Sequence, residues 1–118
     1  MMNAEPFKFN ITAYREGGEH EVIAEICRQA GAAGVEFWPW AVDEDTSSAE
    51  LEQIAGIYRD AGITIDTYHL PFWPDCNVAD PRESKRSEAA SILLSRLEML
   101  PELKVRAVVL HPDGKSNG

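Results

Sequence analysis

Segments with a strand pattern alternate with segments with a helix pattern along this chain, which limits the folds that it can adopt. Strands are expected at residues 7–14, 34–38, 63–69 and 105–110, and helices at residues 19–30, 47–61 and 80–100. This alternation predicts an α/β fold with a parallel sheet in the order βαβαβαβ and right-handed crossovers. Periodicity alone leaves two arrangements open, a doubly wound sheet and a barrel.

Residue types at the helix ends support these boundaries. Gly31 follows the first helix, where glycine tolerates the positive φ of a C-cap. Ser47 and Glu50 have the spacing of a capping box, in which both side chains bond free backbone N–H groups at the start of the second helix. Asp80, directly before a proline, is expected to cap the third helix. His20 lies at the start of the first helix and is expected to be solvated.

The composition counts against several kinds of partner. The 118 residues carry a formal net charge of −9, whereas surfaces for nucleic acid and for anionic membranes both need clustered Lys and Arg. Residues 1–6 lack a basic region followed by an apolar run, so no secretory signal is expected. Cys27 and Cys76 form no Cys-x-x-Cys motif, which fits a reducing compartment. We therefore expect a cytoplasmic protein without a nucleic-acid or membrane partner.

Two histidines occupy matching positions at the ends of strands. His69 ends the third expected strand and His111 follows the fourth, and each lies close to a proline that stops the strand. The carboxyl ends of parallel strands are where α/β folds build their sites. Because neighbouring strands are about 4.8 Å apart, two imidazoles there can reach a common metal ion or substrate oxygen. The spacing leaves both possibilities open.

The segments around these histidines resemble motifs of a known family. His69-Leu70-Pro71-Phe72, followed by Asn77-Val78-Ala79-Asp80-Pro81, is similar to the His-x-Pro-Tyr and Asn-x-Ala-x-Pro segment of endonuclease IV and its relatives. Val108-Val109-Leu110-His111-Pro112 resembles the family's fourth-strand signature, except that Asp113 precedes the expected glycine. Over its whole length the chain resembles the N-terminal part of the xylose isomerase-like family of sugar isomerases, epimerases and endonuclease IV enzymes.

This resemblance implies that the chain is the first half of a (β/α)8 TIM barrel. Residues 1–118 would form a single partial domain that holds strands one to four and is truncated before the second half. The complete protein would be a divalent-metal-dependent isomerase or epimerase of a small sugar or sugar phosphate, with Mn, Mg, Co or Zn as the metal. The chain by itself would be inactive, and its uncovered fourth strand would make it self-associate.

The resemblance also assigns roles to residues at the strand ends. Glu36 is similar to an acidic residue of the family and is the candidate catalytic residue; pairing with a barrel-interior Lys or Arg is the alternative. His69 and His111 would contact substrate in the isomerase and epimerase arrangement, and would bind zinc in the endonuclease IV-like one. Trp38 and Trp73 are candidate substrate-binding residues, because sugar C–H faces pack on aromatic rings; a hydrophobic plug at the barrel top is the alternative.

Three functions follow from these assignments. A sugar isomerase or epimerase needs a base that moves a proton next to a carbonyl and a metal that polarises the oxygens. An abasic-site endonuclease with a zinc cluster would use the two histidines, but the acidic charge counts against a DNA-binding cleft. A non-catalytic fragment or assembly partner is the third alternative.

Overall fold

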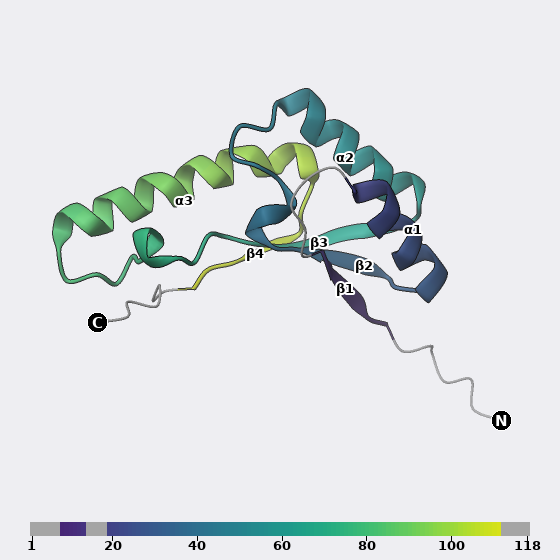
Figure 1. Cartoon of the computed structure of the whole chain (residues 1–118), viewed down its shortest axis with the longest axis horizontal. Coiled ribbons are helices and arrows are strands. Elements are labelled where there is room, and N and C mark those ends of the chain that lie inside the picture. Colours follow the sequence, from purple (N-terminus) through teal and green to yellow (C-terminus); the bar gives the residue numbers. More distant parts are fainter. Residues whose placement is uncertain (1–7, 14–18, 112–118) are drawn as a thin grey trace.

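The computed structural model describes residues 8–13 and 19–111, which form four parallel strands and three long helices (Figure 1). The strands are β1 (Asn10–Ala13), β2 (Gly34–Phe37), β3 (Thr64–His69) and β4 (Ala107–Val109). The helices are α1 (His20–Ala30), α2 (Ser48–Asp60) and α3 (Glu83–Leu103), and two short 3-10 helices, η1 (Pro39–Ala41) and η2 (Pro74–Cys76), follow β2 and β3. The strand order is β1-β2-β3-β4, so the expected α/β fold is confirmed. The ends of the first expected strand (Phe7 and Tyr14) and Pro112 to Gly114 lie outside the described residues.

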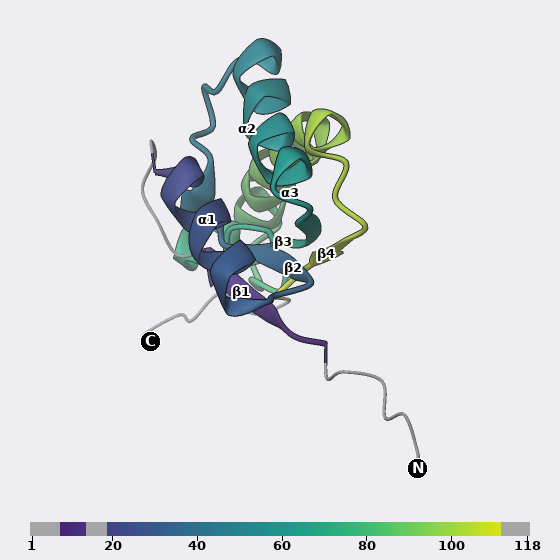
Figure 2. The ribbon, with the colours of Figure 1, turned by 90° about the vertical axis from the view of Figure 1, so that its right-hand side faces the viewer.

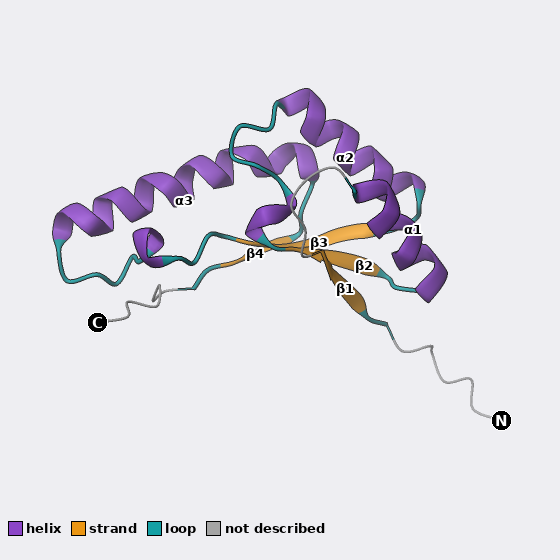
Figure 3. Cartoon of the chain, viewed as in Figure 1, coloured by secondary structure: helices purple, strands orange, loops and turns teal. Residues whose placement is uncertain are grey.

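All three long helices cover the same face of the sheet (Figures 2 and 3). Within residues 8–13 and 19–111, no helix covers the opposite face. This is the layering of a barrel segment, in which helices form the outer ring and the bare face lines the interior. The sheet therefore has one face for the hydrophobic core and one face for polar side chains.

The core lies between the sheet and the helices and is built from the strand side chains that face the helices. Val35 and Phe37 of β2 and Tyr68 of β3 have no exposed surface, because side chains alternate between the two faces of a strand. Helices α1, α2 and α3 complete this layer with the buried residues Ala24, Cys27, Leu51, Tyr58, Leu93 and Leu100. The residues between the buried ones, among them Glu36 and His69, lie on the opposite face.

The expected helix ends are confirmed in two places and wrong in a third. Gly31 has a φ of 76° at the end of α1, and the Ser47 hydroxyl accepts a hydrogen bond from the Glu50 backbone N–H at 3.2 Å. Asp80, however, does not cap α3, which begins only at Glu83. Its carboxylate accepts from the backbone N–H of Arg82 at 2.8 Å and pairs with the Arg82 guanidinium. This local bond holds the backbone in a turn and delays the helix.

The expectation that His20 is solvated is also wrong. Its side chain is packed between α1 and α2 and the residue is only 5% exposed. Nδ1 lies 2.8 Å from the Tyr58 hydroxyl and Nε2 lies 2.8 Å from the carbonyl oxygen of Ala41. Both ring nitrogens are thus paired, which removes much of the cost of burying a polar ring.

Strand β4 is shorter and more exposed than its sequence suggests. Its apolar run is typical of a strand covered on both faces, yet Val108 is 40% and Leu110 is 48% exposed in the described part of the chain. This apolar region is thus partly exposed among the described residues. Self-association through it stays a prediction. No helix among the described residues is both long enough and apolar enough to cross a bilayer.

Replacement of Gly34 tests how tightly β1, β2 and β3 fit together. A Cβ atom at Gly34 would lie 2.5 Å from a carboxylate oxygen of Asp66 and 2.8 Å from the backbone carbonyl of Thr64. Because the Thr64 backbone cannot move without disturbing β3, Gly34→Ala is expected to lower the free energy of unfolding by about 1–3 kcal/mol in urea titrations.

Gly56 in α2 provides the matched control. A Cβ atom there would meet only the flexible end of the Arg59 side chain, at 3.2 Å. Gly56→Ala is therefore expected to be neutral or to stabilise by up to about 1 kcal/mol through helix propensity. Equal losses of stability in the two variants would contradict this explanation.

Candidate active site

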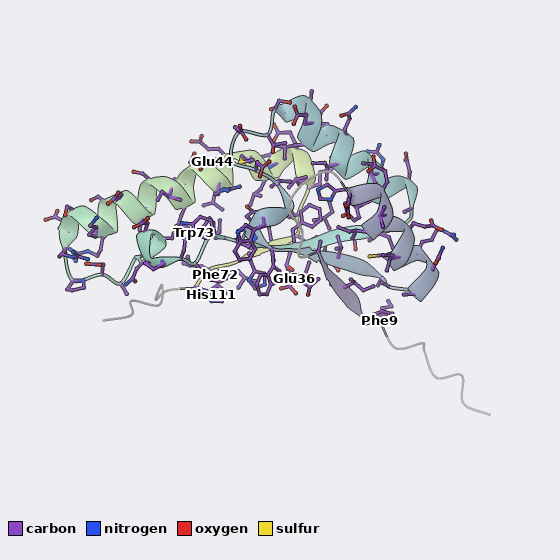
Figure 4. The ribbon with its side chains drawn as sticks, viewed as in Figure 1. Phe9, Glu36, Glu44, Phe72, Trp73 and His111 are labelled. Carbon is purple, nitrogen blue, oxygen red and sulfur yellow. The ribbon has the colours of Figure 1, made fainter. Side chains whose placement is uncertain are left out.

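Polar side chains from neighbouring strands meet on the face of the sheet that the helices leave bare. Thr12 of β1 is paired in register with Glu36 of β2. Between β2 and β3 the register shifts by one residue after Val35, so that Glu36 pairs with Thr67 and the strand ends at His69. His111 lies two residues after the end of β4, beyond the pairing of His69 with Val109. Figure 4 shows Glu36 and His111 on the side of the sheet away from the helices.

These side chains form one hydrogen-bonded chain, here called the polar row: Thr12, Glu36, His69 and His111. The Thr12 hydroxyl donates to Glu36 Oε2 at 3.4 Å. The other carboxylate oxygen of Glu36 pairs with Nε2 of His69. Nδ1 of His69 lies 3.3 Å from Nε2 of His111. Each strand thus contributes one member near its carboxyl end. The three residues that the sequence predicted for this site, Glu36, His69 and His111, are brought together.

The bonding pattern fixes which ring nitrogen of neutral His69 carries the proton. A carboxylate only accepts hydrogen bonds, so His69 must carry its proton on Nε2 to bond Glu36. In neutral His69 the Nδ1 lone pair then accepts from Nε2–H of His111. If His69 is protonated, its Nδ1–H donates instead, and His111 must then carry its own proton on Nδ1 so that its Nε2 can accept. Both forms of His69 keep the bonds to Glu36 and His111, provided that His111 adopts the matching tautomer.

An aromatic cluster borders the polar row. Trp38, Trp40, Phe72 and Trp73, here called the aromatic wall, are all half-buried. Trp38 stacks on Trp40 with ring centroids 5.8 Å apart, and Phe72 meets both of these rings edge-on. The wall touches the row at two points: Trp38 lies 5.6 Å from the ring of His69, and Phe72 lies 4.7 Å from the ring of His111.

The two tryptophans chosen from the sequence occupy different places in this wall. Trp38 contacts the polar row directly through His69. Trp73 packs on Trp40 at 6.4 Å and belongs to the outer part of the wall. The site residue that sequence analysis missed is Thr12. Its signal was the period-two pattern of the first strand, which places Thr12 on the same face as Asn10.

The described residues supply only part of a metal site. Two nitrogens bound to one tetrahedral zinc at about 2.1 Å lie roughly 3.4 Å apart, close to the spacing between His69 and His111. Glu36 would then support His69 from the far side of its ring, as carboxylates often do for metal-bound histidine. However, residues 8–13 and 19–111 contain no group of three or more His, Cys, Asp or Glu side chains that could hold a metal ion. The described residues alone therefore supply too few ligands for a resident metal ion.

Glu36→Gln tests whether the carboxylate fixes the His69 ring. A Gln side chain offers an amide in place of one acceptor oxygen, so His69 is expected to lose its uniform Nε2–H tautomer. The measurement is the 15N chemical shifts of the imidazole nitrogens. Glu44→Gln is the matched control, since Glu44 is exposed and lies on the helix side of the sheet (Figure 4). Unchanged His69 shifts in Glu36→Gln, or equal changes in both variants, would contradict the assignment.

Comparison with known proteins yields similarity in structure and none in sequence. No family model and no curated protein matches the sequence. D-psicose 3-epimerase, solved in the presence of D-fructose, superposes with a TM-score of 0.73 at 17% identity, over 88% of this chain and 37% of that one. D-psicose 3-epimerase from Clostridium cellulolyticum H10, solved with D-tagatose, gives a TM-score of 0.68 at 18% identity, over 88% and 37% of the two chains.

Two further solved structures extend this comparison. The 3-keto-D-glucoside 4-epimerase from E. coli gives a TM-score of 0.60 at 14% identity, over 86% of this chain and 36% of that one. A fusion of a xylose isomerase-like TIM barrel with 4-hydroxyphenylpyruvate dioxygenase gives a TM-score of 0.63 at 18% identity, over 87% of this chain and 16% of that one. The chain thus spans little more than a third of the epimerases. Its four strands and three helices have the fold of part of a xylose isomerase-like TIM barrel, and sugar epimerases are among the proteins that share it.

Proposed function

We propose that this chain forms part of a sugar isomerase or epimerase and binds a small sugar against the polar row and the aromatic wall. The observation that carries the proposal is their contact: a hydrogen-bonded Glu-His-His series adjoins four aromatic rings at the carboxyl ends of parallel strands. A sugar presents hydroxyl groups to bond the row and C–H faces to pack on the wall. The D-fructose and D-tagatose of two structural neighbours make ketohexoses the first sugars to test.

In this proposal the polar row binds the sugar and holds a proton near it. His111 bonds a sugar hydroxyl through Nδ1, the ring nitrogen that the polar row does not use. His69 exchanges its bond to His111 for one to the sugar, while Glu36 keeps the His69 ring in one orientation. The Glu36–His69 pair is then placed to share a proton with a sugar oxygen. A divalent metal (Mn, Mg, Co or Zn), when bound, would polarise the sugar oxygens. Its ligands would come largely from residues other than those described.

A second candidate function is that of a zinc-dependent abasic-site endonuclease. The observation that favours it is the 3.3 Å spacing of the His69 and His111 nitrogens, which suits a shared zinc. The net charge of −9 opposes it, because phosphate backbones are bound by clustered basic residues. We therefore place it second.

The proposal is tested by assaying the complete protein that contains this chain. With added Mn, Mg, Co or Zn, we expect it to interconvert D-psicose, D-fructose or D-tagatose, and the 118-residue chain alone to be inactive. His69→Ala is expected to lower kcat/KM by about 100-fold or more, as removal of a positioned acid-base group does. Thr64→Ala, at the amino-terminal end of β3, is the control and should keep most of the activity. No turnover of any ketohexose, or full activity in His69→Ala, would contradict the proposal.

Metal content of the same variants separates the two candidate functions. If the histidines contact sugar, His69→Ala and His111→Ala should retain as much metal as the unaltered protein. If they bind zinc as in an endonuclease, each substitution should release metal, and the unaltered protein should cut DNA at abasic sites. We expect the first result.

A further inference from the structure

The segment that follows β2 carries half of the aromatic wall. Residues 38–42 contain η1 (Pro39–Ala41), and Trp38 and Trp40 flank its proline. A backbone bond from the Trp38 N–H to the carbonyl of Ala13, at 3.3 Å, ties the near end of this segment to the sheet. The far end of the segment is held from the helix side of the sheet.

Two buried polar side chains bond consecutive carbonyls at that end. His20 Nε2 donates to the Ala41 carbonyl oxygen at 2.8 Å. Arg96 Nη1 donates to the Val42 carbonyl oxygen at 3.0 Å. His20 comes from α1 and Arg96 from α3, so the helices on both sides of α2 each bond one of two neighbouring carbonyls. Both residues are less than 10% exposed, which is costly for such side chains unless they are well bonded.

Each of these side chains is supported by a buried tyrosine. The Tyr58 hydroxyl lies 2.8 Å from His20 Nδ1, and the Tyr68 hydroxyl lies 3.4 Å from Arg96 Nη1. A carbonyl only accepts, so His20 carries its proton on Nε2 and its Nδ1 accepts from the Tyr58 hydroxyl. Protonated His20 would have to donate to the Tyr58 hydroxyl instead. Burial lowers the pKa of His20, although its bond to Ala41 opposes this, so the ring is held in the neutral form.

We propose that His20 and Arg96 are positioning residues that hold the Ala41 and Val42 carbonyls and thereby set the aromatic wall against the polar row. Neither side chain touches the row in the described structure; both act from the helix side of the sheet. The role in holding the wall follows from the bonds alone. Its consequence for sugar binding rests on the proposed function, because only then does the wall contact a substrate.

The tryptophan content of the protein makes this proposal directly measurable. The sequence has three tryptophans, Trp38, Trp40 and Trp73, and all of them belong to the aromatic wall. Tryptophan emission and near-ultraviolet circular dichroism therefore report on the wall and on no other tryptophan in the chain. Far-ultraviolet circular dichroism reports separately on the helices.

The experiment compares His20→Leu with His20→Gln. Leu fills the space but bonds nothing, so emission is expected to move to longer wavelength and the tryptophan dichroism to weaken. Gln can donate to Ala41 and accept from Tyr58, so it should restore both signals. Cys27→Ala is the control, because Cys27 is equally buried in α1 and its thiol is free. It should lower the unfolding midpoint and leave both tryptophan signals in place.

Arg96 provides a second pair of variants if His20→Leu does not fold. Arg96→Met should alter the tryptophan signals, and Arg96→Lys, which keeps a donor, should alter them less. Unchanged signals in His20→Leu and Arg96→Met would overturn the proposal, as would an equal change in Cys27→Ala.

Sugar kinetics keep this proposal distinct from the proposed function. In an active complete protein, His20→Leu should raise the KM for the ketohexose at least about fivefold with kcat changed less, because the wall binds the sugar and does not react with it. Altered tryptophan signals without ketohexose turnover in the unaltered protein would uphold the positioning role and refute the sugar function. Ketohexose turnover by the unaltered protein, together with unchanged tryptophan signals in His20→Leu and Arg96→Met, would uphold the sugar function and refute the positioning role.

Discussion

The hydrogen bond between Glu36 and His69 is the interaction on which the site depends. It joins neighbouring strands at their carboxyl ends, fixes the His69 tautomer, and leaves Nδ1 of His69 for the bond to His111. The bond is possible because β2 and β3 are parallel and their register shifts after Val35. Without that shift, the side chains at these strand ends would pair differently. The site is therefore a product of strand register as much as of residue type.

The same strands connect the site to the hydrophobic core. Phe37 follows Glu36 and Tyr68 precedes His69, and both aromatic rings are fully buried under the helices. Tyr68 also contacts Arg96, which bonds the segment that carries Trp38 and Trp40. Core residues and site residues are thus direct neighbours in sequence on the same strands. A substitution in the helices can change the site without touching it.

The sequence was sufficient to predict the fold and the meeting of three site residues, but not the details of burial. Alternating periodicity predicted the parallel order, and the prolines near His69 and His111 indicated where strands end. The burial of His20 could not be predicted, because its partners lie 21 and 38 residues away along the chain. The late start of α3 was missed because Asp80 has the residue type of a cap and uses its carboxylate for a turn instead. Thr12 was missed because its partner is fixed by strand register.

A double-mutant cycle between Glu36 and His111 tests most directly whether the polar row acts as one unit. The free energy of unfolding is measured for the unaltered chain, Glu36→Gln, His111→Ala and the double variant. Since His69 joins the two residues, we predict a coupling energy of about 0.5 kcal/mol or more. Effects that add to within about 0.3 kcal/mol would show that the residues act independently and would contradict this account of the site.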